Sequence, residues 1–188
     1  MLNRVLDQSK QFAYDILHPH SIAVDATCGN GNDTSFLLDH ISKGKVYAFD
    51  IQSEAIESTK EKIAHHKNLE QLTLIHDSHE NVLQYVDKHI DVAMFNLGFL
   101  PKANKTITTL SHSTITAIEA ILSQLSVGGR IIITIYHGHE NGKDEKRAVL
   151  SYAEKLDQHF FNVLMYRFIN QINDAPFILV IERRRSSP

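Results

Sequence analysis

The chain has 188 residues, of which 43% are hydrophobic and 22% charged, a composition typical of globular proteins. This length fits a single domain over residues 1–188 with one sizeable core. One cysteine, Cys28, excludes a disulfide framework and a thiolate zinc cluster. No apolar run approaches the roughly 18 residues that a membrane span needs, and the first 20 residues lack the core of a secretory signal. We therefore expect a cytoplasmic protein with no membrane partner.

The net charge of -3 conceals an asymmetry between the two halves of the chain. Residues 1–94 hold 8 Lys and Arg against 14 Asp and Glu, whereas residues 95–188 hold 11 against 8. The basic half ends in Arg183, Arg184 and Arg185. Such a half could face a polyanion, although the charge alone favours a solvated tail.

Apolar strands alternate along the chain with amphipathic helices. In chain order we expect a helix at 2–17, a strand at 22–27, a helix at 33–40, a strand at 45–50, a helix at 53–66 with Ser53 as its N-cap, a strand at 72–75, a short helix at 79–87, a strand at 91–95, a helix at 111–125 that stops at Gly128-Gly129, a strand at 130–136, a helix at 143–158 and strands at 161–169 and 176–183. This order predicts an α/β fold with a mostly parallel seven-stranded sheet and helices on both faces. The short turn between the last two strands predicts an antiparallel edge.

An open α/β sheet binds its ligand beyond the carboxyl ends of its strands. The first strand ends there in Asp25-Ala26-Thr27-Cys28-Gly29-Asn30-Gly31-Asn32-Asp33. Gly29 and Gly31 allow a tight turn and close approach of a ligand. Neither the third glycine of a dinucleotide-binding turn nor a P-loop Gly-Lys-Ser/Thr is present, which disfavours a dehydrogenase. The acidic turn instead suits a nucleoside with a positive end.

Two further strand ends supply polar groups for such a nucleoside. Asp50 ends the second strand about 20 residues after the glycine turn, where a carboxylate accepts hydrogen bonds from a ribose diol. Asp77 and Ser78 follow the third strand and could recognise an adenine edge. The alternative for Asp50 is a solvent-facing helix cap before Ser53, and for Asp77 and Ser78 a role without ligand contact is equally open.

The segments DATCGNGND at 25–33 and YAFDIQ at 47–52 resemble motifs I and II of class I S-adenosylmethionine methyltransferases. With HDSHE at 76–80, FNLGFLP at 95–101 and YHGH at 136–139, nearly the whole chain resembles a bacterial family first described as rRNA methylases. That family is now assigned as MnmM-type tRNA 5-aminomethyl-2-thiouridine methyltransferases. The resemblance implies a Rossmann-like fold and S-adenosylmethionine as cofactor.

The resemblance also assigns the cofactor-binding residues. Asn30, Asn32 and Asp33 would hold the methionine moiety and the sulfonium region, beside Cys28 in the same turn. Asp50 and Gln52 would hold the ribose, and Ser78 with His79 the adenine side.

The acceptor site is expected after the fourth strand, at Asn96-Leu97-Gly98-Phe99. Amino-directed methyltransferases carry Asn/Asp-Pro-Pro-Tyr/Phe there, and this chain is similar at the first and fourth positions. An attacking amine must present its lone pair in line while acceptors hold its hydrogens. The Asn96 side chain and the Leu97 carbonyl could accept them, with Gly98 and Phe99 beside the base. A strand terminus with an Asx turn is the alternative.

Tyr136, His137 and His139 follow the fifth strand and are expected beside this pocket. Either histidine could accept the amine proton, although solvent could also do so. Twelve histidines and His-x-His pairs at 18/20 and 137/139 raise the possibility of zinc, but no cysteine or carboxylate pattern supports it, so we expect no metal. An amine substrate needs no covalent nucleophile, so Cys28 is expected to pack.

The resulting hypothesis is methyl transfer from S-adenosylmethionine to the aminomethyl nitrogen of 5-aminomethyl-(2-thio)uridine at the tRNA wobble position, which gives 5-methylaminomethyl-2-thiouridine. The expected partner is the tRNA anticodon stem-loop, whose phosphates would contact Lys102, Lys105, Lys143, Lys146 and Arg147. The alternatives are a methyltransferase acting on rRNA or a small-molecule amine, and a nucleotide-binding module without catalysis. The sequence leaves open whether the protein forms a homodimer.

Overall fold

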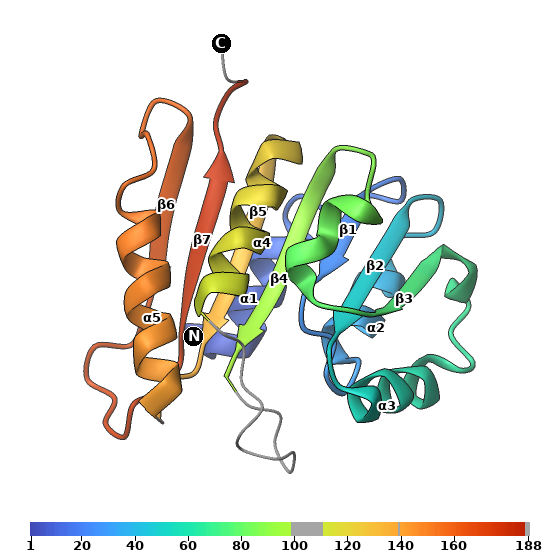
Figure 1. Ribbon diagram of the computed structural model, residues 1–188, viewed down its shortest axis with the longest axis horizontal. Helices are drawn as coiled ribbons and strands as arrows, with labels where there is room; N and C mark the ends of the chain where they lie inside the picture. The colour runs from blue at the N-terminus through green and yellow to red at the C-terminus, as the bar shows by residue number, and fades with distance from the viewer. Residues whose placement is uncertain (99–110, 139, 187–188) are drawn as a thin grey trace.

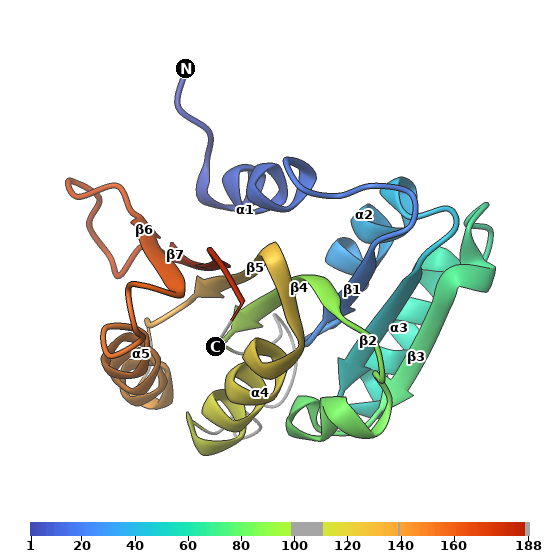
Figure 2. The ribbon, with the colours of Figure 1, turned by 90° about the horizontal axis from the view of Figure 1, so that it is seen from above.

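The computed structural model describes residues 1–98, 111–138 and 140–186, which form one sheet between two layers of helices (Figures 1 and 2). The strands are β1 (Ile22–Asp25), β2 (Lys45–Asp50), β3 (Leu72–His76), β4 (Ile90–Leu97), β5 (Leu125–Ile135), β6 (Phe161–Tyr166) and β7 (Phe177–Arg183). The helices are α1 (Val5–Tyr14), α2 (Asn32–His40), α3 (Ser53–Ile63), α4 (Ser111–Gln124) and α5 (Glu140–Ala153), with short 3₁₀ helices η1 (Leu69–Gln71) and η2 (His79–Gln84).

The sheet has the order β3-β2-β1-β4-β5-β7-β6. Neighbours from β3 to β5 pair in parallel, and β7 pairs antiparallel with both β5 and β6. The predicted seven-stranded α/β sheet with an antiparallel edge is therefore confirmed. The strand order switches between β1 and β4, and an open α/β sheet of this kind typically binds its ligand at the carboxyl edge of the strands at such a switch point.

Strand β5 differs most from the sequence prediction, because it begins at Leu125 and continues through Gly128-Gly129. The pairing with β4 jumps from Ile90↔Leu125 to Val92↔Arg130, so the glycines lie in an irregular stretch. A Cβ on Gly129 would lie 2.9 Å from the Ser126 carbonyl oxygen, which explains why glycine stands there. Elsewhere the errors are at element ends: α5 begins at Glu140, and Ser53 is the first residue of α3 rather than its N-cap, which is Gln52.

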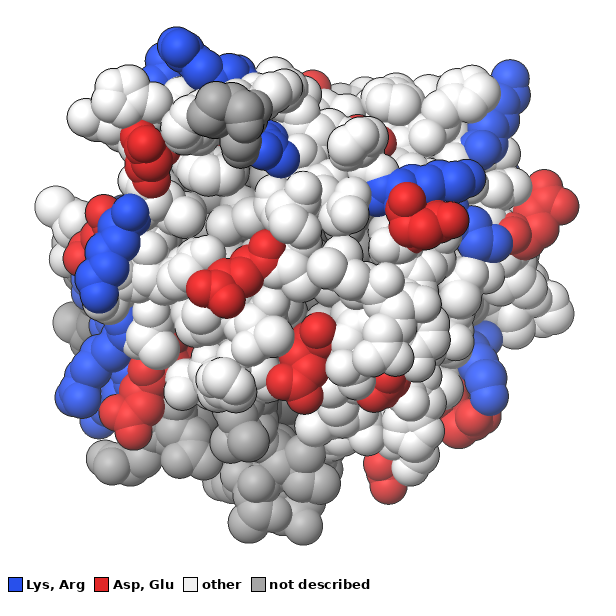
Figure 3. Space-filling view, turned by 45° about the horizontal axis from the view of Figure 1, so that its top comes forward, with Lys and Arg blue, Asp and Glu red and all other residues white. Residues whose placement is uncertain are grey.

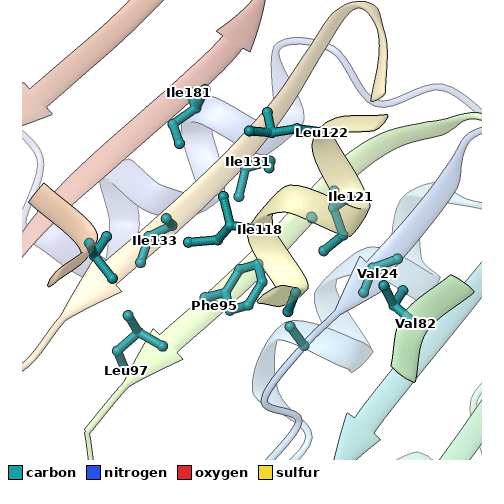
Figure 4. Packing of buried hydrophobic residues seen from close by; sticks show 14 of the residues in the cluster. Val24, Val82, Phe95, Leu97, Ile118, Ile121, Leu122, Ile131, Ile133 and Ile181 are labelled. Carbon is teal, nitrogen blue, oxygen red and sulfur yellow. The ribbon is translucent and has the colours of Figure 1, made fainter. Parts of the chain in front are cut away.

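Alternating residues of the strands divide the core between the two faces of the sheet. On one face, apolar residues of β4 and β5 pack under α4 and α5, and Phe95, Ile118, Ile131 and Ile133 meet at its centre (Figure 4). On the other face, Met94 and Ile132 pack with residues of α1 and α2. The same alternation decides toward which face the polar residues at the strand ends point.

No helix in the described ranges is long and apolar enough to cross a membrane. The face in Figure 3 carries acidic and basic side chains interspersed, without a continuous surface of one sign.

A substitution of Ile118 tests the packing of the core between the sheet and the helices α4 and α5. The side chain is fully buried on α4 over Phe95 and the β5 isoleucines. Ile118→Ala should lower the free energy of unfolding by about 2–5 kcal/mol, because it leaves a cavity in a packed core. Urea unfolding measures the loss. The exposed Val127→Ala is the control and should change stability by less than about 0.5 kcal/mol; equal effects of the two changes would contradict the packing described.

Candidate functional site at the carboxyl edge

The turn after β1 has the tight backbone that its two glycines predict. Gly29 and Gly31 adopt φ angles of 51° and 72°, and Gly31 is the N-cap of α2. A Cβ on Gly31 would lie 3.1 Å from the Cα of Thr59, so the turn lies directly against α3. The Thr59 hydroxyl donates to the Gly29 carbonyl oxygen at 3.1 Å and fixes this contact. The backbone amides of the turn are thereby held in one arrangement.

Asp50 connects the ends of β1 and β2. Its two carboxylate oxygens accept the backbone N–H groups of Gly29 and Gln52, each at 3.0 Å. A carboxylate has about four acceptor positions, so two remain for hydroxyl groups of a ligand. The side chain is neither the N-cap of α3 nor fully solvated, and its role in holding a ribose stays a prediction.

Four hydrogen bonds and the peptide bond between Asp33 and Thr34 connect five polar residues in a ring across the edge. This group is here called the polar ring: Asp25, Thr27, Asp33, Thr34 and Asn96. Asp25 accepts the Thr34 hydroxyl at 2.6 Å and the Thr27 N–H at 3.3 Å. The Thr27 hydroxyl accepts the Asn96 N–H at 2.7 Å. The Asn96 side-chain NH₂ donates to Asp33 at 2.6 Å, which closes the ring because Thr34 follows Asp33 in α2. The ring joins β1, α2 and β4.

The two carboxylates of the polar ring are poorly solvated. Burial, reinforced by the neighbouring charge of Asp33, raises the pKa of Asp25 from 3.8 to about 7. Burial also raises the pKa of Asp33, against the opposing effects of the Asn96 hydrogen bond and Lys10. A cation placed beside these groups would favour their charged forms. The electrostatics therefore fit a ligand with a positive end.

The other predicted residues of the turn differ in accessibility. Asn30 and Asn32 are exposed at the rim, where their amides are available to a ligand. Cys28 is buried against Ala48 and Ile56, and its N–H donates to the Phe49 carbonyl at 2.8 Å. Burial raises the pKa of the Cys28 thiol, with Asp25 as the next cause. This placement is compatible with a packing role and leaves the thiol unreactive.

On the adenine side, Asp77 is already engaged by the protein. It accepts the Tyr85 hydroxyl at 2.8 Å, the Ser78 N–H at 2.7 Å and the Asn81 amide. These hydrogen bonds lower the pKa of Asp77, the one from Tyr85 most strongly. Tyr85, eight residues away in sequence, carried no signal that linked it to this turn. Ser78 caps η2, and its hydroxyl accepts the Glu80 N–H at 3.4 Å.

His79 lies beneath the edge rather than at its surface. Its Nδ1 lies 2.9 Å from the Ala26 carbonyl oxygen, so Nδ1 carries the proton, and the ring packs edge-on to Phe95. Burial lowers the pKa of His79 and keeps it neutral. Its Nε2 is buried and has no hydrogen-bond partner among the described residues.

The acceptor residues that are described meet at the ends of β4 and β5. The Leu97 carbonyl accepts the Tyr136 N–H at 2.9 Å, so one of its two lone pairs is used within the sheet. Gly98 has a φ of 143°, and a Cβ there would lie 2.9 Å from the Tyr136 Cβ. Tyr136 is half-buried, and burial followed by the charge of Asp33 raises its pKa. Phe99 and His139 lie outside the described residues.

His137 points toward the face of the sheet opposite Asn96 and Tyr136. Its ring packs on Phe177 at 5.7 Å between centroids, and its Nδ1 lies 3.5 Å from Asp174 Oδ1. Burial and then Lys146 lower the pKa of His137, while Asp174 raises it. Its Nε2 is buried, and no described residue hydrogen-bonds it. Asp174 comes from the turn before β7, and sequence reasoning missed it because nothing in its local pattern links it to β5.

The donor set fits S-adenosylmethionine but offers nothing comparable for a metal. Asp50 has free acceptor positions for a ribose, and burial raises the pKa of both carboxyl groups of the polar ring despite the nearby Lys10, so a cationic group there would stabilise their charged forms. Within residues 1–98, 111–138 and 140–186, no group of three or more His, Cys, Asp or Glu side chains is placed to hold a metal ion.

The buried Asp25 predicts a dependence of stability on pH. Below pH about 4 both folded and unfolded chains keep the Asp25 proton, whereas from about 4 to 7 only the folded chain does, so stability should fall as pH rises through that window. Asp25→Asn should remove much of this decline in urea unfolding between those pH values. Asp7→Asn, on the exposed face of α1, should retain it. An undiminished decline in the Asp25→Asn protein would contradict the assignment.

Comparisons with known proteins agree with the geometry. Residues 46–182 match the family described as "Putative rRNA methylase". A chloroplastic tRNA (mnm(5)s(2)U34)-methyltransferase of Arabidopsis thaliana is 34% identical over 91% of this chain, which spans 66% of that protein, just under two thirds. The crystal structure of a "putative rRNA-methylase" from Clostridium thermocellum matches this chain with a TM-score of 0.95 and 38% identity. The match covers 97% of this chain and 99% of that one. A Streptococcus mutans methyltransferase, in complex with SAH, has a TM-score of 0.90 and 43% identity, with the same coverages.

The site, the fold and these matches lead to one conclusion: the chain belongs to this rRNA-methylase family of S-adenosylmethionine-dependent methyltransferases.

Proposed function

We propose that the protein methylates the aminomethyl nitrogen of 5-aminomethyl-(2-thio)uridine at the wobble position of tRNA, which gives 5-methylaminomethyl-2-thiouridine. The polar acceptor at Asn96, next to the predicted cofactor site, is the observation that carries the amine chemistry. The Arabidopsis relative, a tRNA (mnm(5)s(2)U34)-methyltransferase, supports the choice of nucleoside. The family description leaves methylation of rRNA as the alternative substrate.

When bound, S-adenosylmethionine supplies a methyl carbon that the amine lone pair attacks while the carbon–sulfur bond breaks and sulfur keeps the electron pair. The protein's own contribution is to hold the reactants. Asp50 and Gln52 would hold the ribose end, and Asn30, Asn32 and Asp33 the methionine end. The backbone of the glycine turn, fixed by Thr59, keeps these groups at a constant separation.

Asn96 is the proposed acceptor for a hydrogen of the amine. Because an ionised carboxylate only accepts hydrogen bonds, Asp33 binds the NH₂ end of the Asn96 amide. The amide oxygen is therefore left for the substrate. The second lone pair of the Leu97 carbonyl could accept the other hydrogen. An amine held by two acceptors presents its lone pair in one direction, which the in-line attack requires.

The proton lost by the substrate has two possible acceptors. His137 has a buried, neutral ring, but it points away from the face that carries Asn96. Solvent at the rim would accept the proton without a protein base. The role of His137 as a base stays a prediction, as does a homodimer.

Labelled methyl transfer tests the reaction and the substrate together. Purified protein, labelled S-adenosylmethionine and bulk tRNA from a strain lacking this gene should yield label in a methylaminomethyl-uridine, identified by nucleoside mass analysis. Label in ribosomal RNA and none in tRNA would favour the alternative substrate. Cofactor binding with no label in either RNA would direct the search to small-molecule amines or to a module without catalysis.

Asn96→Ala tests the acceptor geometry. Loss of one hydrogen-bonding group at a reacting centre typically costs about 10²-fold in turnover. We expect a fall of that size, measured at saturating cofactor, while the affinity for the cofactor changes much less. Asn162→Ala on the exposed face of β6 is the matched control and should leave turnover unchanged. Unchanged turnover in the Asn96→Ala protein would make the assignment wrong.

A further inference from the structure

The segment between β6 and β7, residues 167–176 and here called the β6–β7 loop, lies at the same edge as the site. Phe177, the first residue of β7, pairs with Ile135, the last residue of β5. The loop therefore meets the sheet beside the Tyr136–His137 end of β5, and Figure 1 shows it at the edge where β4 and β5 end.

Both ends of this loop are fixed to the body of the protein. At its start, Phe168 packs edge-on to Tyr166, whose ring contacts Phe12 and whose hydroxyl donates to the Asn3 carbonyl at 2.8 Å. At its end, Asp174 lies 3.5 Å from His137. Asn173 and Asp174 both have positive φ angles, 64° and 50°, a conformation that costs energy for residues other than glycine. The contacts at both ends hold the loop in this shape.

Between these fixed ends, the loop exposes two large apolar side chains. Ile169 is 93% and Ile172 80% exposed, more than any other isoleucine described. Burial of an isoleucine side chain is favourable, so two of them held in solvent by a loop that is fixed at both ends offer apolar area to a partner.

The charges around the loop are mainly basic. The Lys146 ammonium of α5 lies over the ring of Phe177, the residue after the loop, 5.7 Å from its centroid. After burial, Lys146 and Arg167 both lower the pKa of His137. Lys143 is exposed one turn earlier in α5. Of the nearby acids, Asp144 lies 3.4 Å from Arg147 and Asp174 faces His137. All three cations, Arg167, Lys143 and Lys146, lack a carboxylate partner among the ion pairs of the described residues.

We propose that the β6–β7 loop is an RNA-contact element, in which Ile169 and Ile172 pack against unpaired bases while Arg167, Lys143 and Lys146 contact phosphates. The inference rests on the proposed function and extends it to the recognition of the loop that carries the target base. Apolar side chains and cations side by side suit a single-stranded RNA loop, which displays bases and phosphates together. The position of the loop beside the acceptor residues would let both engage one RNA.

The double variant Ile169→Ser/Ile172→Ser tests the apolar contact. Both side chains are exposed, so the fold and the affinity for S-adenosylmethionine should be unchanged. The affinity for tRNA from the deletion strain, measured by filter binding, should fall by about tenfold. Loss of a side-chain contact with a base typically lowers affinity by about that factor. The KM for tRNA should rise in parallel while kcat stays within about twofold. Val127→Ser, also exposed but near the opposite edge, is the control and should bind tRNA normally.

Arg167→Gln tests the ionic contact separately. It should lower the slope of log affinity against log salt by about 1, because one phosphate contact is lost.

The outcomes separate this inference from the proposed function. If the wild-type protein binds tRNA through the loop but transfers no methyl group, the proposed function is wrong and the proposed RNA contact is supported. Normal tRNA binding by the double variant would overturn the contact even where tRNA methylation is confirmed. A change of sedimentation coefficient with normal tRNA binding would overturn it too, and would assign the loop to an interface between two copies of the chain.

Discussion

The polar ring is the constraint on which the rest of the site depends. β1 and β4 pair directly in the sheet and α2 follows the turn after β1, and the side-chain hydrogen bonds at their ends set how the glycine turn meets the acceptor residues. Asp25 binds Thr27 and Thr34, Thr27 binds Asn96, and Asn96 binds Asp33. Because these four hydrogen bonds run from α2 through the turn to β4 and back to α2, the predicted cofactor side and acceptor side share one geometry. The fully buried carboxyl of Asp25 and the partly buried one of Asp33 are costly to ionise without a cation beside them. A sulfonium and an ammonium group would supply positive charge there, so the site is complementary to such a ligand in charge.

The position of the site could be predicted from the sequence, because strand order and glycine conformation are local signals. Gly29, Gly31 and Asp50 meet as expected, since the turn and the end of β2 are neighbours in any sheet of this topology. The partners of these residues could not be predicted. Tyr85 reaches Asp77 and Asp174 reaches His137 through loops whose paths no periodicity encodes. The start of β5 was missed for a similar reason: Gly128-Gly129 looks like a terminator, but it lies in an irregular stretch beside Asp91.

The sign of the charge changes across the carboxyl edge. The polar ring and Asp50 gather carboxylates where a cationic cofactor would bind. α5 and the start of the β6–β7 loop gather Lys and Arg around His137. This difference is local, because the face in Figure 3 carries acidic and basic side chains interspersed. A cationic cofactor and an RNA would each be attracted by the local charge of opposite sign.

Two consecutive residues at the end of β5 connect these regions. Strand alternation directs Tyr136 toward the face that carries Asn96 and Asp33, where the charge of Asp33 raises its pKa. His137 faces the other way, against Phe177 and Asp174. A displacement of the β6–β7 loop by a bound RNA would therefore be transmitted from His137 to Tyr136 through the one peptide bond that joins them. In this arrangement His137 would act mainly by holding the loop. Binding of the RNA would shift Tyr136 and Leu97 together, because the Tyr136 N–H donates to the Leu97 carbonyl.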